Sequence, residues 1–283
     1  MLSKNSKMSN LHENSGQLAS VFECEGTVVE NRLVNDEYRH LVLIVRRDAL
    51  AIMPGQFFHI QCPQGDGAIS YLRRPMSIYH FDQEAGKVEF LYKVHGKGTR
   101  AMSVLEKGHT INIFGPLGRG FWLEDSWQHL VLVARGVGLA TLAPLARYAS
   151  ERGKKLTAIC SARAPNLLMS LDLFRSYGAE IIPVTDHDGS SSVENLEVLI
   201  DNLIAKQGID AFYTCGSNRI LKLLQKLCKR EGIAGQTALE QQMACGIGMC
   251  FCCVRPFNVD GKIIHRRVCN EGPVFNLMES QPW

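Results

Sequence analysis

Four cysteines stand close together near the end of the sequence, in EQQMACGIGMCFCCVRP (residues 240–256), and a fifth follows in HRRVCNEGPVF. Leaving out Cys252, the intervals are four, two and fifteen residues along the series Cys245, Cys250, Cys253 and Cys269. A C-x4-C-x2-C run with a distant fourth cysteine is the ligand spacing of one type of [2Fe-2S] cluster. The spacing therefore predicts thiolate ligands for two irons and single-electron chemistry.

Two glycines within this run favour the same interpretation. A loop that wraps a cluster must turn its backbone N–H groups toward sulfur, and Gly246 and Gly248 permit the dihedral angles that this requires. Structural zinc is the alternative, although zinc sites usually pair one C-x2–4-C with a second such pair. Cys252 is expected to point away as an ordinary buried thiol. His265 is a conceivable ligand of a Rieske-type cluster. A single histidine among basic residues is, however, more often a surface group.

A cluster that moves single electrons needs a source of electrons, and two stretches offer a flavin site. LRRPMSIYHFD places Arg74 and Ser77 on one predicted strand. Arginine can pair with a pyrophosphate, and a serine can hydrogen-bond a flavin ring. Downstream, Gly96, Gly98 and Thr99 precede a short helical pattern, where free N–H groups favour an anion. Each of the two stretches also has a purely structural explanation. The first can be an ordinary Arg–Pro pair on a strand, and the second an ordinary glycine turn.

Short alternating apolar runs fill residues 20–122 and must position these side chains. The runs are FECEGTVVENRLV, YRHLVLIVR, GQFFHIQC, MSIYHF, KVEFLYKVH and HTINIFGPLG. Six such runs at this spacing predict an antiparallel barrel or sandwich.

After residue 122 the pattern becomes strand alternating with helix. The predicted strands are HLVLVAR, KLTAICSA, AEIIPVTD and IDAFYTCG, and the predicted helices GLATLAPLARYASERG, NLLMSLDLFRSYG, VENLEVLIDNLIAKQG and SNRILKLLQKLCKREG. This alternation indicates βαβ units and a parallel sheet over residues 123–235. The remaining residues, 236–283, hold five of the ten cysteines and too little apolar sequence for an independent core, a lack that a metal centre would compensate.

Composition excludes several classes of protein. The net charge of +3 comes from 31 basic and 28 acidic residues spread through the chain, which does not favour nucleic acid. Residues 1–19 are polar and predict a disordered tail rather than a secretory signal. The longest apolar run is interrupted by Arg135 and by glycines, so no membrane span is expected. A cytoplasmic protein is expected, with cysteines present as thiols or metal ligands.

The order of these motifs resembles the ferredoxin-NADP reductase superfamily, and the C-terminal motif resembles in particular the electron-transfer subunits of B-type dihydroorotate dehydrogenases. The resemblance implies an α+β multi-domain fold: a six-stranded FAD-binding barrel (20–122), an α/β NAD(P)-binding domain (123–235) and a small [2Fe-2S] domain (236–283). It implies FAD contacts from Arg74, Pro75, Met76, Ser77, Leu91, Tyr92, Lys93, Gly98 and Thr99. It implies the cluster ligands Cys245, Cys250, Cys253 and Cys269.

The nucleotide-binding turn departs from the family pattern. Members carry G-G-G-I-G-x-A-P after the first strand of this domain, and here the sequence reads ARGVGLAT. Gly136 and Gly138 remain, Ala134 and Arg135 replace two glycines, and Thr141 replaces the proline. Glycine there lets a pyrophosphate approach the backbone. Arg135 either adds a charge partner for phosphate or obstructs the site.

Cys215 and Gly216, in YTCGSN, occupy a place that lies near the nicotinamide in this superfamily, although Ser217 replaces a proline. Cys215 is equally well explained as a small buried residue at the end of a strand.

Four polar residues leave the choice between NAD and NADP open. Ser161 and Arg163 are candidates for an adenosine 2′-phosphate, and Arg163 is equally well a solvated charge. Asp186 and Asp188 lie in a loop whose family counterpart is near the nucleotide, but an exposed acidic turn is the commoner meaning.

The resulting hypothesis is an electron relay between NAD(P)(H), FAD and a [2Fe-2S] cluster, to or from an FMN-containing catalytic subunit that oxidises dihydroorotate. No proton-transfer catalyst is assigned. Two alternatives remain: the same module in another redox complex, such as a sulfite or sulfur reductase, a hydrogenase or a bifurcating transhydrogenase, or a conducting subunit whose nucleotide site is degenerate.

Overall fold

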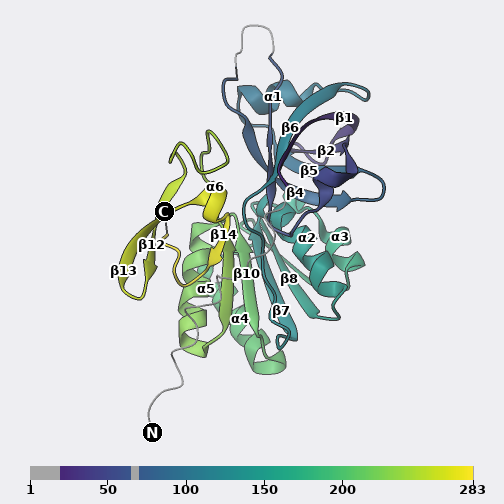
Figure 1. Cartoon of the computed structure of the whole chain (residues 1–283). Helices are drawn as coiled ribbons and strands as arrows, with labels where there is room; N and C mark the ends of the chain where they lie inside the picture. Colours follow the sequence, from purple (N-terminus) through teal and green to yellow (C-terminus); the bar gives the residue numbers. More distant parts are fainter. Residues whose placement is uncertain (1–19, 65–69, 283) are drawn as a thin grey trace.

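A computed structural model describes residues 20–64 and 70–282 of the chain. It consists of a barrel, a sheet with helices on both faces, and a cysteine-rich segment beside them (Figure 1). The tail predicted over residues 1–19 lies outside the described residues.

The barrel is closed by six antiparallel strands in the order β1-β2-β5-β4-β3-β6. Their bounds are β1 Phe22–Leu33, β2 Tyr38–Ile44, β3 Phe57–Ile60, β4 Arg74–Asp82, β5 Lys87–Lys93 and β6 Thr110–Leu117. Alternate side chains fill the interior, among them Leu41, Leu43, Phe58, Ile60 and Phe90. One short helix, α1 (Lys97–Ser103), follows β5, and η1 (Arg47–Leu50) follows β2. The predicted six-stranded barrel is confirmed.

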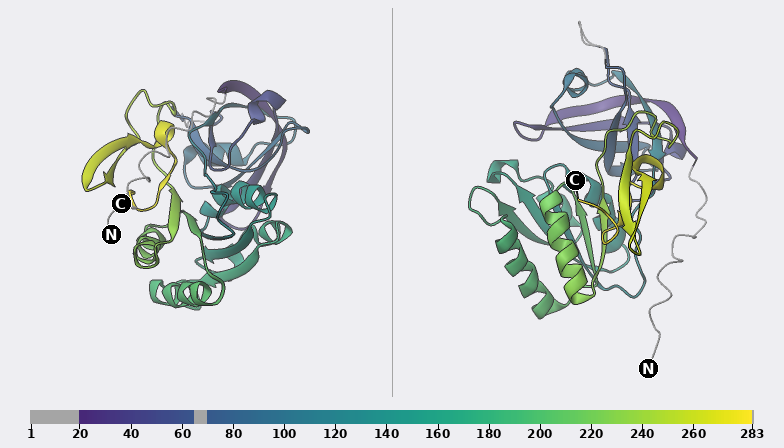
Figure 2. Two further views of the ribbon diagram at one scale, coloured as in Figure 1. Left: turned by 60° about the horizontal axis from the view of Figure 1, so that its bottom comes forward. Right: turned by 90° about the vertical axis from the view of Figure 1, so that its left-hand side faces the viewer.

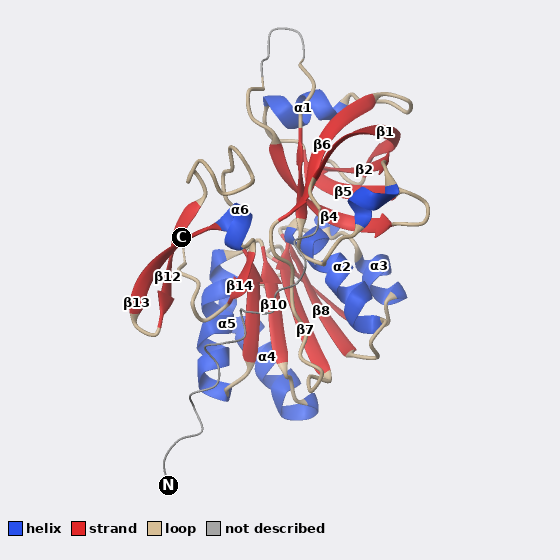
Figure 3. Cartoon of the chain, in the orientation of Figure 1, coloured by secondary structure: helices blue, strands red, loops and turns tan. Residues whose placement is uncertain are grey.

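The second sheet has the order β14-β11-β10-β7-β8-β9. Its strands are β7 His129–Arg135, β8 Lys155–Ala162, β9 Glu180–Thr185, β10 Ala211–Cys215, β11 Ala234–Ala238 and β14 Val274–Asn276, and only β14 pairs antiparallel. Helices α2 (Gly138–Ser150) and α3 (Leu171–Ser176) cover one face, and α4 (Val193–Gln207) and α5 (Asn218–Glu231) the other (Figure 3). The predicted parallel sheet is therefore confirmed.

Two details of this sheet differ from expectation. The helix expected over residues 166–178 is reduced to α3, with a separate 3-10 turn η2 (Pro165–Leu167), because Ser170 adopts a left-handed φ of 65° between them. In addition, the proposed division at residue 235 passes through β11. The division into three domains stays a prediction, since the C-terminal segment contributes β14 to the same sheet.

The C-terminal segment forms a hairpin of β12 (Val254–Val259) and β13 (Lys262–Arg267), then α6 (Val268–Glu271) and β14. The hairpin stands out from the rest of the molecule in the left view of Figure 2. A buried cluster joins this segment to the barrel, with Leu239, Met243, Phe257, Val268 and Phe275 packed against Phe57 and Leu117. The segment therefore shares its core with the outer face of β3 and β6.

Within residues 20–64 and 70–282, no helix has the length and apolarity needed to cross a membrane.

Candidate functional site

The four predicted ligand cysteines come together in two pairs. The thiols of Cys245 and Cys250 are hydrogen-bonded to each other, and so are those of Cys253 and Cys269. Cys253 and Cys269 are buried, whereas Cys250 is exposed and Cys245 half-buried. The site thus has a closed side toward the protein and an open side toward solvent.

Backbone N–H groups converge on these sulfur atoms. Gly248 donates to Cys269 Sγ at 3.2 Å, and Met249 donates to Cys245 Sγ at 3.3 Å. The N–H of Cys269 donates to Cys253 Sγ at 3.3 Å. Hydrogen bonds of this kind stabilise the negative charge of metal-bound thiolates and tune a cluster's potential.

The same environment separates the acidities of the thiols. Burial raises the pKa of Cys245, but hydrogen bonds from the Cys250 and Ile247 backbone outweigh it and lower that pKa to about 6. Burial and the adjacent Cys253 thiol instead raise the pKa of Cys269 to about 12. Cys245 therefore loses its proton at a lower pH than Cys269.

The cysteine loop has the backbone conformation expected at its two glycines, but it does not bury Cys252 as expected. Gly246 and Gly248 have φ of 74° and 84°, values that other residues rarely adopt. Cys252 is exposed, so the prediction of a buried thiol was wrong; it lies on the outer turn before β12, where no core covers it. His265 is also exposed, on β13.

Two thiol pairs fit a two-iron cluster better than one zinc ion. Among the described residues, no three side chains of His, Cys, Asp or Glu are grouped around one metal-ion position. A [2Fe-2S] cluster needs two cysteines on each of two irons, an arrangement that Cys245 with Cys250 and Cys253 with Cys269 match.

The predicted flavin motif lies on β4, where residues 74–77 are half-buried. A Cβ atom added to Gly98 would lie 3.2 Å from Arg74 Nη2 and 2.8 Å from Cys62 Sγ, so the glycine lets the first turn of α1 lie directly against the guanidinium. Arg74 donates only to the backbone carbonyls of Leu72 and Arg73 among the described residues. The guanidinium and the N–H groups at Gly98 fit a pyrophosphate.

The other predicted flavin contacts are placed less uniformly. Leu91 packs between the barrel and α2, but the Tyr92 ring points into the barrel core, where its hydroxyl donates to Asn31 Oδ1 at 3.0 Å. Lys93 pairs with Glu37 at 2.6 Å. Thr99 Oγ1 accepts from the N–H groups of His95 and Gly96 and so caps α1. Contacts from Tyr92 and Thr99 to a flavin would therefore run through their backbones.

Ser77 is connected to the nucleotide domain by a chain of polar contacts that the sequence did not predict. Thr141 Oγ1 donates to Ser77 Oγ at 2.9 Å, and Cys215 Sγ donates to Thr141 Oγ1 at 3.6 Å. Burial raises the pKa of Cys215, which keeps this thiol protonated. The available signal was a hydroxyl-bearing residue, Thr141, in the first turn of α2 where the family pattern has proline.

The glycine turn joins β7 to α2 against the end of β10. Gly136 has φ of 56°, and Gly216 has φ of 89°. A Cβ atom at Gly138 would lie 2.5 Å from the carbonyl oxygen of Cys215, and one at Gly216 would lie 2.7 Å from that of Arg135. These glycines therefore allow the two backbone segments to touch.

Gly138→Ala is expected to lower the free energy of unfolding by about 1–3 kcal/mol, because the new methyl group must push α2 away from β10. Urea denaturation followed by circular dichroism measures the change. Gly96→Ala is the matched control, since nothing lies within 4 Å of its added Cβ. An equal effect of the two substitutions would contradict close packing at Gly138.

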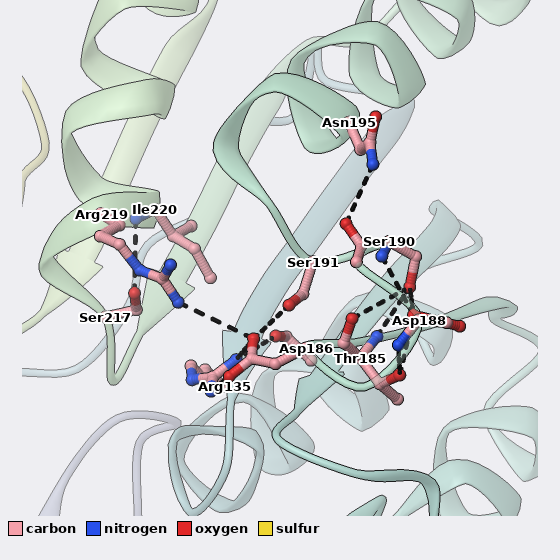
Figure 4. A network of polar contacts seen from close by, with 12 residues as sticks. Arg135, Thr185, Asp186, Asp188, Ser190, Ser191, Asn195, Ser217, Arg219 and Ile220 are labelled. Atoms are coloured by element: carbon pink, nitrogen blue, oxygen red, sulfur yellow. Dashed lines mark hydrogen bonds and ion pairs between the residues drawn. The ribbon is translucent and has the colours of Figure 1, made fainter.

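Arg135 turns its side chain across the carboxyl ends of the neighbouring strands (Figure 4). Its guanidinium donates to Ser161 Oγ at 3.0 Å and to both carboxylate oxygens of Asp186, at 3.0 and 2.5 Å. Arg219 approaches the same carboxylate at 3.9 Å, and Ser191 donates to it. The hydrogen bond from Arg135 lowers the pKa of Asp186, so the arginine's charge is already paired.

The remaining candidates around the nucleotide site also have partners. Arg163 forms an ion pair with Glu37 of the barrel. Asp188 accepts from Thr185 Oγ1 at 2.8 Å and from Ser190 Oγ at 2.5 Å, and the bonds from Ser190 lower its pKa to about 2. Asp188 thus stabilises its own turn.

A cavity of about 400 Å³ lies between the barrel and the segment before α3. Its lining includes Arg32, His40, Tyr79 and Leu91 but none of residues 74–77. It therefore adjoins the predicted flavin site only through Leu91.

The cysteine loop lies directly against the barrel strand that neighbours the flavin motif. A Cβ atom at Gly246 would lie 2.8 Å from the ring of His59 in β3. His59 is paired in register with Pro75 of β4. One strand therefore separates the predicted flavin contacts from the cysteine loop.

Comparison with known proteins agrees with this arrangement. Residues 25–122 match the model of the oxidoreductase FAD-binding domain, and residues 240–280 match that of the iron-sulfur cluster binding domain of dihydroorotate dehydrogenase B. The dihydroorotate dehydrogenase B (NAD(+)) electron transfer subunit of Caldanaerobacter subterraneus subsp. tengcongensis is 34% identical over 78% of this chain and 84% of its own. The chain belongs to the family of dihydroorotate dehydrogenase B electron transfer subunits. That of Desulforamulus reducens is 31% identical over 79% of this chain and 84% of its own.

Solved structures extend the likeness to nearly the whole chain. A chain of the NADH-dependent reduced ferredoxin-NADP oxidoreductase has a TM-score of 0.77 and 26% identity, covering 91% of this chain and 90% of that one. The ferredoxin-NADP+ reductase of Plasmodium falciparum, at 13% identity and a TM-score of 0.59, covers 77% of this chain and 93% of that one, and shows the shared fold alone. This member of the electron transfer subunit family therefore has an FAD-binding barrel and an iron–sulfur cluster binding segment.

Proposed function

We propose that this chain relays electrons between a nicotinamide nucleotide and a catalytic subunit that oxidises dihydroorotate, through FAD and a [2Fe-2S] cluster. The contact between Gly246 and His59, one strand away from residues 74–77, carries the proposal. Electrons pass efficiently between redox groups only when these lie close together, and this contact supports sites for FAD and the cluster on neighbouring surfaces of one barrel.

The residues of the chain have binding and orienting roles in this proposal. A bound flavin exchanges electron pairs with nicotinamide and single electrons with an iron–sulfur centre. Arg74 and the backbone at Gly98 would hold the pyrophosphate, and Ser77 would orient the ring. The four cysteines would hold the cluster.

An apolar surface around the cysteine loop supports a partner protein there. Ile247, Met249 and Phe251 are 44%, 74% and 64% exposed, next to the exposed Cys250. The centres of protein interfaces are depleted of charge and enriched in aromatic residues and methionine. A catalytic subunit docked on this surface would cover the open side of the cluster.

Met249→Asp is expected to weaken binding of the catalytic subunit at least about 10-fold, because docking must then desolvate a charge. Isothermal titration of the loaded subunit with its partner measures the loss. Val198→Asp on α4 is the control, since that side chain is 61% exposed but lies outside this surface. Unchanged affinity, with iron content equal to that of the unaltered protein, would contradict the docking surface.

Rapid mixing with NADH and with NADPH tests the relay itself. The visible flavin absorbance should bleach with at least one of the two, and bleaching by neither would favour a conducting subunit without nucleotide chemistry.

Asp186→Asn should lower the KM for that nucleotide about 3–10-fold, since Arg135 is then released from a competing carboxylate. Asp188→Asn, which has no bond to Arg135 among the described contacts, should leave it unchanged. A higher KM for Asp186→Asn would mean that the ion pair orders the site.

A second candidate is a subunit of a different NADH-dependent redox complex. The 26% identity to the NADH-dependent reduced ferredoxin-NADP oxidoreductase chain, over 91% of this chain, favours it. Reconstitution with an FMN-containing dihydroorotate dehydrogenase subunit separates the two candidates. Dihydroorotate-dependent reduction of NAD+ supports the first, and its absence from a reconstituted complex supports the second.

A further inference from the structure

His59 is an unpaired polar residue at the contact between barrel and cysteine loop. Along β3, Phe58 and Ile60 face the barrel core, so the alternation turns His59 outward, beneath the C-terminal segment. It is 0% exposed, and neither ring nitrogen has a hydrogen-bond partner among the described residues.

In the part of the chain that the structure describes, the neighbours of the ring offer its nitrogens no hydrogen bond. Phe57 lies 5.6 Å away between ring centroids, and Phe114 is its paired residue on β6. Gly246 of the cysteine loop also lies against the ring: a Cβ atom added to it would lie 2.8 Å from His59 Cε1 and 2.9 Å from His59 Nδ1. Burial and the charge of Arg73 lower the pKa of His59 to about 4, so the ring is neutral at pH 7, with one N–H donor and one acceptor nitrogen.

A buried donor left unpaired costs about 1–3 kcal/mol, and nearly all such groups in native proteins have a partner. An apolar side chain would fill the same space without that cost. The missing partner is therefore a group that the chain binds. The ring lies against Gly246, the residue directly after Cys245, on the outer face of β3 that the C-terminal segment covers. The group held by the cysteine loop is therefore the candidate for that partner.

We propose that His59 donates a ring N–H hydrogen bond to an acceptor sulfur of the iron–sulfur centre held by Cys245, Cys250, Cys253 and Cys269. His59 is then a positioning residue that sets the reduction potential of the centre and fixes its loop against the flavin strand. The reduced centre carries one more negative charge, so the bond stabilises the reduced form more and raises the potential. This inference rests on the proposed function, which supplies the cluster.

The test compares two variants by redox titration followed with electron paramagnetic resonance. In His59→Leu the midpoint potential of the cluster should fall, while the flavin midpoint and the iron content stay the same. His265→Leu removes an exposed histidine on β13 by the same substitution and should leave both midpoints unchanged. An unchanged cluster midpoint in iron-loaded His59→Leu overturns the inference, and so does a shift confined to the flavin.

A second measurement needs no folded variant. With 15N-labelled histidine in the unaltered protein, pulsed resonance of the reduced cluster should detect a weak coupling to one ring nitrogen. Absence of that coupling in cluster-loaded protein overturns the inference but leaves the relay intact. Absence of the cluster itself, in protein purified without oxygen, would overturn the proposed function instead.

Discussion

Cys250→Ser is expected to abolish the iron–sulfur centre and to stop electron transfer to the catalytic subunit, whereas electron exchange between NAD(P)H and FAD should continue. Cys250 is paired with Cys245, and serine replaces a thiolate by a hydroxyl that does not ionise at neutral pH. Loss of an outer partner of a metal ligand already costs about 10–100-fold in metal affinity, and loss of the ligand itself should cost more. Iron and acid-labile sulfide analysis, together with rapid mixing against NAD(P)H, measures the two effects separately.

Cys252→Ser is the matched control, because this cysteine is exposed two residues away and no described thiol pair includes it. Its iron content should equal that of the unaltered protein. Equal damage from the two substitutions would mean that the ligand set includes Cys252.

Arg74→Ala is expected to weaken FAD binding by about 1.5–3 kcal/mol, which corresponds to about a 10–150-fold increase in Kd. The guanidinium lies against the first turn of α1 at Gly98, where it and the free backbone N–H groups would meet the pyrophosphate in charge-assisted bonds. Equilibrium titration of deflavinated protein with FAD, followed by flavin fluorescence, gives the dissociation constant.

The neighbouring Arg73 provides the control for charge. It forms an ion pair with Glu23 on the barrel surface at 2.6 Å, and Arg73→Ala should change the FAD dissociation constant less than about 3-fold. If Arg73→Ala is the more damaging substitution, the pyrophosphate lies on the other side of the strand.

Periodicity predicted the fold well because the strands and helices that matter carry strong local signals. HLVLVAR is apolar between its first and last residues, as expected for a strand covered on both faces, and it forms β7 over the same residues. β11 and β14 were missed: AGQTA and VFN are too short to show a pattern, and they pair only because β10 and β11 offer an open edge.

For the candidate site, too, local features could be predicted from the sequence and long-range contacts could not. The intervals between cysteines are fixed along the chain, so the thiol pairs could be predicted from the sequence. The partners of Arg135 and Ser77 could not, because Asp186 and Thr141 are 51 and 64 residues away in sequence and meet them only after folding. His59 gave no signal either, since a histidine alternating with apolar residues in a strand is commonly a surface residue.

Strands β11 and β14 are antiparallel neighbours, with Ala238 opposite Val274. Everything from the cysteine loop through the β12–β13 hairpin to α6 is therefore an excursion of the chain that leaves the sheet and returns beside its point of departure. A short turn between those two strands would bypass the excursion without crossing any other part of the fold. Protein engineering can thus exchange the iron-binding part between the ends of these two strands, provided that the replacement covers Phe57 and Leu117 on the barrel.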